Sequence, residues 1–308
     1  MRPALAVISL LPLSLALLPL SLAACNRTGD QPAPYDASPL GAGLRLAQVQ
    51  DPQSPDYHPG DNADMSSLVV TWLDTFDETM DGKSKGTLYV QDVGSQAPYA
   101  GVGIFEQSLV PASLTVLPGD VLDFQGPYQE SIGIGTAVFN TCTFLAQLYK
   151  PVGTFRYEFT PPDPVELTVD DLSENGAKSL SCRDSGASTV DTNFAMSRRW
   201  LGMLVKLKDV YVTAGTATVG GGGFRVSYSL EEADGGVAPN GPAITNEHFD
   251  LKCPASLACP LPSPCPVGSK TCTSFAAGTH FSSVTGIVTW FYSFHVAPRY
   301  PADLVVAP

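Results

Sequence analysis

Short runs of β-branched and aromatic residues, each bounded by glycine, proline or aspartate, follow one another along most of this 308-residue chain. Such runs are typical of β-strands that are separated by turns. One group of runs lies within residues 63–165 and a second within residues 196–308. No segment after the apolar N-terminal region keeps a helical period over three turns. The sequence therefore predicts an all-β protein.

The two groups of runs are similar in their order. The run LVVTWLDTF in the first group corresponds to LVKLKDVYV in the second, GTLYVQD corresponds to GGFRVSYS, and GDVLDFQGPY corresponds to FSSVTGIVTWFY. This order indicates an internal duplication. We therefore predict two tandem small β-barrels over residues 63–165 and 196–308, with a linker over residues 166–195. A single larger β-sandwich is the alternative.

The N-terminus has the pattern of a bacterial lipoprotein signal. An apolar segment over residues 4–24 follows Arg2 and ends in Leu-Ala-Ala directly before Cys25. In such signals residues 1–24 are removed and the cysteine thiol carries lipid, palmitate included. We therefore expect an exported protein that is anchored through Cys25 to the cell envelope, at the outer membrane. An uncleaved membrane-spanning anchor is the alternative, and two prolines within the segment disfavour it.

Residues 25–62 are polar and rich in proline, without a sustained hydrophobic period. This composition is typical of a linker. We expect a flexible tether that holds the folded part away from the lipid anchor.

The remaining cysteines are even in number, which favours disulfide bonds in an oxidising compartment. Four of them lie in a proline-rich segment over residues 253–272, which predicts a loop stapled by disulfides. A zinc site is disfavoured there, because the segment has neither paired C-x2-C knuckles nor a histidine at ligand spacing. The candidate disulfide residues are Cys142, Cys182, Cys253, Cys259, Cys265 and Cys272.

Several segments resemble a known family. The stretch GTLYVQDVGSQAPYAGVGIFEQ, followed by LTVLPGDVLDFQGPYQESIG, is similar to the OB-fold region beside extracellular bacterial nucleases and in exported lipoproteins of myxobacterial type. The matching positions are Gln91, Asp92, Gly101, Gly103, Gly119, Asp120 and Gly126, and near the C-terminus Pro298, Arg299 and Asp303. The resemblance implies an OB-like barrel that binds nucleic acid or another polymer. No segment resembles the catalytic domain of those nucleases.

The charge of the chain disfavours binding to a polyanion. Seventeen basic and thirty acidic residues give a net charge of −13. Contacts of lysine and arginine with phosphates supply most of the non-specific affinity for nucleic acid. After removal of the signal, residues 25–165 carry 6 − 17 = −11 and residues 166–308 carry 10 − 13 = −3. The second half is therefore the less unfavourable place for a polyanion.

Candidate ligand-binding residues follow from strand alternation and from local charge. Tyr89 and Gln91 are expected to point away from Leu88 and Val90 on their strand. An OB barrel binds single strands with aromatic platforms beside cationic side chains. A structural role in packing is the alternative for any aromatic residue in a strand. The full set of candidates is Tyr89, Gln91, Arg198, Arg199, Trp200 and Arg225.

No catalytic motif stands in a suitable context. The G-x-S-x-G pattern at residues 82–86 precedes a strand rather than a helix, so we interpret it as a hairpin loop. The four histidines are scattered along the chain. The acidic group of Asp74, Asp77, Glu78 and Asp81 does not fit an EF-hand loop, and a solvated turn is the favoured interpretation.

The sequence therefore predicts a lipid-anchored, non-catalytic binding or interaction module without a metal or cofactor. We expect the lipid on Cys25 to attach the protein to the membrane, and we expect an envelope protein as the binding partner. A nucleic-acid- or polysaccharide-binding accessory protein is the first alternative, and a hydrolase of unrecognised type is the second.

Overall fold

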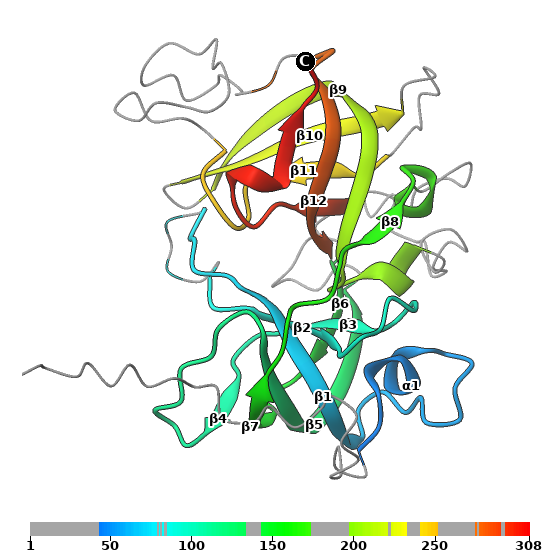
Figure 1. Ribbon diagram of the computed structural model, residues 1–308, viewed down its shortest axis with the longest axis vertical. Coiled ribbons are helices and arrows are strands. Elements are labelled where there is room, and N and C mark those ends of the chain that lie inside the picture. The colour runs from blue at the N-terminus through cyan, green and yellow to red at the C-terminus, as the bar shows by residue number, and fades with distance from the viewer. Residues whose placement is uncertain are drawn as a thin grey trace, which may run out of the picture.

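A computed structural model describes residues 43–78, 80, 82, 85–133, 143–173, 197–220, 223–232, 241–251, 275, 277–290 and 293–308. Two β-rich units are stacked along the long axis of the molecule (Figure 1). Within the described residues one short α-helix accompanies fourteen strands, which confirms the all-β class. None of the helices in this part of the chain has the length and apolar character needed to cross a bilayer.

The first unit is a closed barrel of five strands. Its ring runs β1-β2-β3-β6-β5 and closes through pairing of β5 with β1. The β3–β6 pair is parallel and the other four pairs are antiparallel. This closed ring is compatible with an OB-like barrel. The ring strands are β1 Asn62–Leu73, β2 Leu88–Asp92, β3 Gly101–Ile104, β5 Asp120–Gly133 and β6 Thr143–Leu148.

The second unit repeats this arrangement. Its strands run β9-β10-β11-β13-β12, and pairing of β12 with β9 closes the ring. The β11–β13 pair is parallel and the others are antiparallel. These strands are β9 Leu204–Gly220, β10 Gly223–Glu232, β11 Ala243–Thr245, β12 His280–Trp290 and β13 Phe294–Ala297.

The two rings share strand order and direction, as the predicted duplication requires. Even the irregularities correspond, because the first strand of each ring contains one residue with a left-handed backbone. These residues are Ser67 (φ 62°) in β1 and Asp209 (φ 54°) in β9. The register between β1 and β5 shifts beside Ser67, between Met65 and Leu68, and the pairing of β9 with β12 keeps its register but has no pair at Asp209. The order of elements therefore supports two copies of one unit.

Additional elements flank each ring. Strands β4 Ser108–Val110 and β7 Val152–Glu158 extend the first barrel. Strands β8 Val165–Leu167 and β14 Leu304–Val306 extend the second. Three short 3-10 turns complete the described chain, namely η1 Asp170–Leu172, η2 Arg198–Trp200 and η3 Pro301–Asp303.

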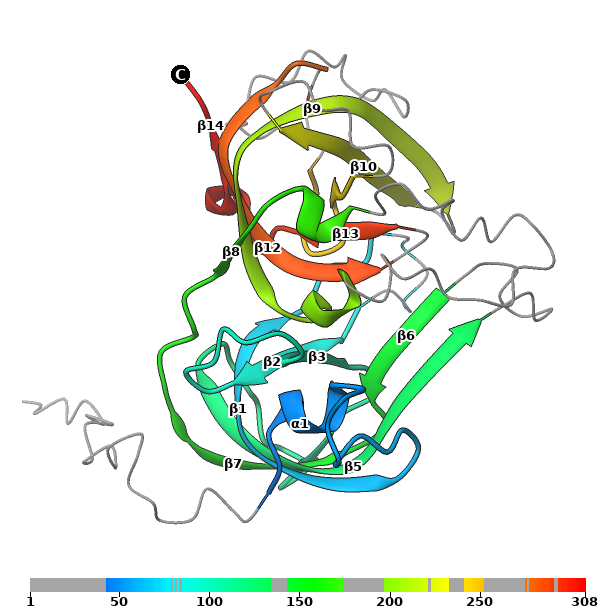
Figure 2. The ribbon, with the colours of Figure 1, turned by 90° about the vertical axis from the view of Figure 1, so that its right-hand side faces the viewer.

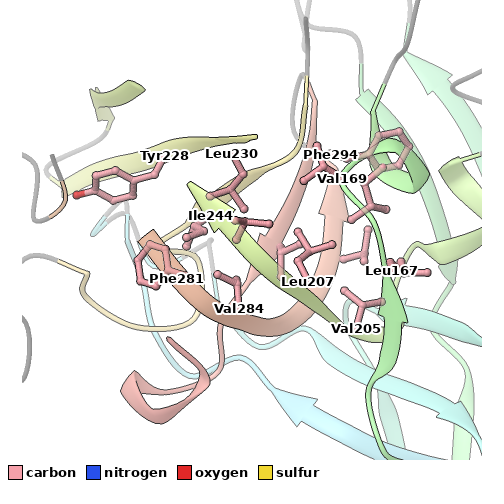
Figure 3. Packing of buried hydrophobic residues seen from close by; sticks show 14 of the residues in the cluster. Leu167, Val169, Val205, Leu207, Tyr228, Leu230, Ile244, Phe281, Val284 and Phe294 are labelled. Atoms are coloured by element: carbon pink, nitrogen blue, oxygen red, sulfur yellow. The ribbon is translucent and has the colours of Figure 1, made fainter. Parts of the chain in front are cut away.

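Each barrel has its own apolar core. The first contains Leu68, Leu88, Phe124 and Tyr128, all at most 2% exposed. The second contains Tyr228, Ile244, Phe281 and Phe294 from four ring strands, together with side chains from β8 (Figure 3). Strand β12 is buried without interruption from Val284 to Thr289, along both of its faces.

The predicted tether does not extend to residue 62. Leu44 pairs with Met65 beside β1, and helix α1 Leu46–Gln50 packs Leu46 (0% exposed) and Val49 (2%) into the first core. Asp92 caps this helix, because its carboxylate accepts hydrogen bonds from the backbone amides of Leu46 and Ala47 at 2.9 and 3.2 Å. Residues 43–62 are therefore part of the first unit.

The predicted boundary near residue 165 also shifts. Val165, Leu167, Val169 and Leu172 are all buried in the second core, and β8 pairs with β9. The second unit therefore begins at residue 165, before the start that we predict at residue 196. Residues 174–196 of the predicted linker lie outside the described residues.

Candidate functional site: the seam between the barrels

The outer face of β2 and β3 is the surface on which an OB-like barrel holds a ligand. Leu88 and Val90 point into the first core, so Tyr89 and Gln91 face outward, as strand alternation predicts. Nevertheless Tyr89 is 6% exposed and Gln91 is 0% exposed. Both are covered by the second barrel, and we call this contact surface between the two barrels the seam.

Tyr89 and Gln91 join the barrels directly. Tyr89 packs with Leu204 and Ile287 of the second barrel in a small apolar cluster. The amide oxygen of Gln91 accepts a hydrogen bond from the backbone amide of Leu204 at 3.2 Å. These side chains therefore bind a domain of the same chain, at the place where the sequence predicts a ligand.

Two glycines allow the backbones to approach at the seam. A Cβ atom at Gly202, where φ is +74°, would lie 2.6 Å from both N and Cα of Val102. A Cβ atom at Gly101 would lie 2.8 Å from the carbonyl of Gly202. Gly101 is one of the positions of the family resemblance, and here it makes room for the second barrel.

The arginines of η2 are engaged by carboxylates. The guanidinium of Arg198 makes two hydrogen bonds to Glu130 of β5, at 2.8 and 3.1 Å, and both side chains are nearly buried. Arg199 lies 3.5 Å from Asp171 and stacks 5.0 Å from the Trp200 ring, and its carbonyl accepts a hydrogen bond from the amide of Tyr99.

Trp200 belongs to the core of the second barrel. Its side chain is 7% exposed and packs in the cluster that also holds Ala100 from the first barrel. It is therefore not available as a platform on which a base or sugar could stack.

Arg225 completes a polar group inside the seam. Its guanidinium lies 2.9 Å from Glu78 of the first barrel. Glu78 is 4% exposed and Asp74 is 3% exposed, so the solvated turn that we predict for these two residues is wrong. The cause is the second barrel, which covers the turn through Arg225 and Glu247. Asp81 lies outside the described residues.

Burial perturbs the pKa values of these carboxylates. Burial, reinforced by the nearby charge of Glu247, raises the pKa of Asp74 to about 8. Burial raises the pKa of Glu78 to about 7, although Arg225 acts in the opposite direction. Asp74 is therefore mainly protonated at neutral pH, whereas a solvent-exposed aspartate would be ionised.

Glu247 connects this group to aromatic and histidine side chains. It accepts hydrogen bonds from Thr289 at 2.7 Å and from the Tyr89 hydroxyl at 3.3 Å. The ring of His248 packs edge-on against Tyr89, with the centroids 5.3 Å apart. Burial lowers the pKa of His248 and lowers that of His295 to about 4, so both imidazoles are neutral at pH 7.

The six predicted ligand residues therefore meet at the seam rather than on an open face. Sequence reasoning missed Glu247 and the burial of Asp74 and Glu78. The acidic group that contains Asp74 and Glu78 is visible in the sequence. Its burial depends on the second barrel, which the sequence does not place over it. No group of three or more His, Cys, Asp or Glu side chains is arranged to hold a metal ion within the described part of the chain.

A pocket separate from the seam lies beside α1. It is a pocket of about 340 Å³ that is open to solvent. Its lining consists of Leu44, Val49, Asp56, His58, Asp61, Asn62, Ala63 and Asp64. The excess of carboxylates makes this pocket unsuitable for phosphate or another anion.

The remaining predicted sites lie outside the described residues. They are the lipidation site Cys25 and the six candidate disulfide cysteines, Cys142, Cys182, Cys253, Cys259, Cys265 and Cys272. Ser84 of the G-x-S-x-G pattern is also outside them.

No protein-family model matches this chain, and neither the curated proteins nor the solved structures contain a match to it.

Proposed function

We propose that this protein is a lipid-anchored component of the bacterial cell envelope, and that its two OB-like barrels form a non-catalytic interaction module for another envelope protein. The lipobox ending at Cys25 supports the anchor. The observation that carries the interaction role is that all three arginines predicted for polyanion binding are paired with carboxylates: Arg198, Arg199 and Arg225.

The seam supports a module that acts as one body. Glycine contacts, an apolar cluster and two ion pairs from distant parts of the chain hold the barrels together. Such a body presents a fixed surface to a partner. An acidic surface is better suited to a protein partner than to a polyanion.

The anchor is tested by labelling growing cells with radioactive palmitate and separating membranes from soluble protein. We expect label and membrane association for the natural chain, and loss of both for Cys25→Ser. A labelled Cys25→Ser chain, or an unlabelled natural chain in the membrane fraction, contradicts lipid attachment at this residue.

The first alternative is an accessory protein that binds nucleic acid or polysaccharide, and the closed barrels favour it. A gel-shift series with single-stranded DNA and a glycan array, both over increasing salt, separate the two functions. We expect no binding. Binding that weakens steeply with salt supports the polyanion instead.

The second alternative is a hydrolase, which the perturbed carboxylates of the seam favour, because such shifts cluster at active sites. Purified protein is tested for esterase and phosphodiesterase turnover. We expect none from either the natural chain or His248→Gln. Turnover that His248→Gln abolishes contradicts the non-catalytic role.

A further inference from the structure

Strands β4 and β7 form a ribbon outside the first ring, with apolar side chains exposed to solvent. The two strands pair in parallel, with Ser108 opposite Val152 and Val110 opposite Thr154. Val110 is 51% exposed and Val152 is 43% exposed. Exposed apolar side chains gathered at one place mark a contact surface.

Aromatic side chains lie where the ribbon begins. Phe105 is 40% exposed and Tyr149 is 38% exposed. The two neighbouring residues connect them, because Lys150 forms a 3.1 Å ion pair with Glu106 and lies 5.2 Å from the Tyr149 ring. Phenylalanine, tyrosine and lysine are typical of surfaces that rest at the boundary between lipid and water.

Both cations at the ribbon are paired with carboxylates, although the chain has a net charge of −13. Lys150 pairs with Glu106, and Arg156 of β7 lies 3.3 Å from Asp123. The carboxylates of Glu106 and Asp123 are each balanced by a cation, so these two pairs do not repel a bilayer surface. The apolar side chains can approach lipid without removing an unpaired charge from water.

The tether reaches the first barrel at the same end of the molecule. Leu44 pairs with Met65 of β1. The residue before Met65, Asp64, lies opposite Gln125 of β5, and Gln125 lies opposite Val152 of β7. The start of the described chain and the ribbon are therefore separated by two neighbouring strands. In Figure 2 the described chain begins beside β5 and β7, at the end remote from the second barrel. From Cys25 to Gly43 there are 43 − 25 = 18 residues. These span at most about 60 Å when extended, so this end of the molecule can reach the bilayer.

We propose that the β4–β7 ribbon docks on the lipid bilayer to which Cys25 is attached. The inference rests on the proposed lipid anchor. Docking orients the molecule, with the first barrel on the membrane and the second barrel directed away from it, toward the partner. The lipid supplies attachment and the ribbon supplies orientation.

The test uses the mature chain with Cys25→Ser, so that the ribbon is measured without the acyl chain. The protein is floated with phosphatidylcholine vesicles over a series of lipid concentrations. We expect measurable binding that Val152→Asp weakens about tenfold, the factor that corresponds to keeping one valine side chain out of water. The matched control is Val305→Asp, because Val305 is 47% exposed on β14, the corresponding strand of the second barrel. The control should leave the bound fraction unchanged.

Absence of vesicle binding, or an equal loss in both variants, overturns the proposal. Sedimentation of the same samples without lipid measures whether the protein is a monomer or a dimer, and so distinguishes lipid docking from self-association. If Val152→Asp converts a dimer into a monomer, then the ribbon contacts another copy of this chain and does not dock on lipid. Palmitate labelling tests the anchor independently, so failure of the anchor and failure of the ribbon are distinguishable.

Discussion

The two barrels share one ring but differ in the strands that flank it. In the second barrel β8 lies parallel to β9 and buries Val165 and Leu167 in the core. In the first barrel the described residues place only the bridge at Leu44 in the corresponding position beside β1, and α1 completes the core instead. Strand β4 has no counterpart among the described residues of the second barrel, and it leaves Val110 exposed. The two barrels thus have the same ring of strands, and the flanking strands account for the differences between their surfaces.

The barrels also use their corresponding faces differently. The β2–β3 face of the first barrel is covered through Tyr89 and Gln91. On β10 of the second barrel, Arg225 reaches across the seam to Glu78 but keeps 31% of its side chain exposed. The outer β2–β3 face of the first barrel therefore holds the second barrel.

The largest effect on this contact is expected from Gly202→Ala. The left-handed backbone costs an alanine about 1 kcal/mol, and the clash with the backbone of Val102 adds the cost of overpacking. We expect a loss of about 3 kcal/mol in the free energy of unfolding, measured by denaturant titration with tryptophan fluorescence. Gly278→Ala is the control, because Gly278 has φ +83° and nothing within 4 Å of the added methyl group. Equal losses in the two variants would show that the seam does not constrain Gly202.

Arg198→Ala should have the next largest effect. The substitution leaves Glu130 nearly buried without its cation, and such a loss costs about 3 kcal/mol. The ion pair between Lys208 and Glu166 provides the control, since both side chains are more than half exposed. Lys208→Ala should not change the denaturation midpoint measurably. If both variants behave alike, the Arg198 pair contributes no more than a surface ion pair.

Sequence patterns predict most of the ring strands but not β6 or β11, and they miss the seam for a physical reason. Alternation and β-branched runs are local, so they predict β2, β12 and the outward direction of Tyr89. The seam depends on contacts between residues far apart, such as Tyr89 and Glu247, which are 158 positions apart. Helix α1 has only five residues, which is too short for a period to appear. Arginine and tryptophan recur in ligand sites and in protein interfaces alike, so composition cannot separate the two.

The buried proton of Asp74 predicts how the seam responds to pH. The pKa of Asp74 is about 8 in the folded chain and about 3.9 in an unfolded one. Between about pH 3.9 and pH 8 the carboxyl of Asp74 is protonated in the folded chain and ionised in the unfolded chain. The free energy of unfolding therefore falls as the pH rises through this window. Glu247, Glu78 and Asp77 all act to raise this pKa.

Asp74→Asn should remove this pH dependence, because asparagine keeps an acceptor for the amide of Phe76. At pH 9 we expect the variant to be more stable than the natural chain by about 1 kcal/mol or more, with little difference at pH 4, where the carboxyl is protonated in the folded chain and about half protonated in the unfolded one. Thermal unfolding at both pH values measures the effect. Asp61→Asn, at an exposed position, is the control. A difference between Asp74→Asn and the natural chain that does not change with pH would contradict the buried proton.

The smallest effect is expected from Tyr89→Phe, and it tests the role of this residue most directly. The substitution keeps the ring and removes only the hydroxyl that donates to Glu247. If Tyr89 joins the barrels, the free energy of unfolding falls by about 1 kcal/mol. If Tyr89 served instead as a stacking platform, the ring would suffice and stability would not change. Tyr157→Phe is the matched control, because the buried hydroxyl of Tyr157 has no hydrogen-bond partner among the described residues. A loss in Tyr89→Phe without a loss in Tyr157→Phe therefore assigns the hydroxyl of Tyr89 to the contact between the two copies.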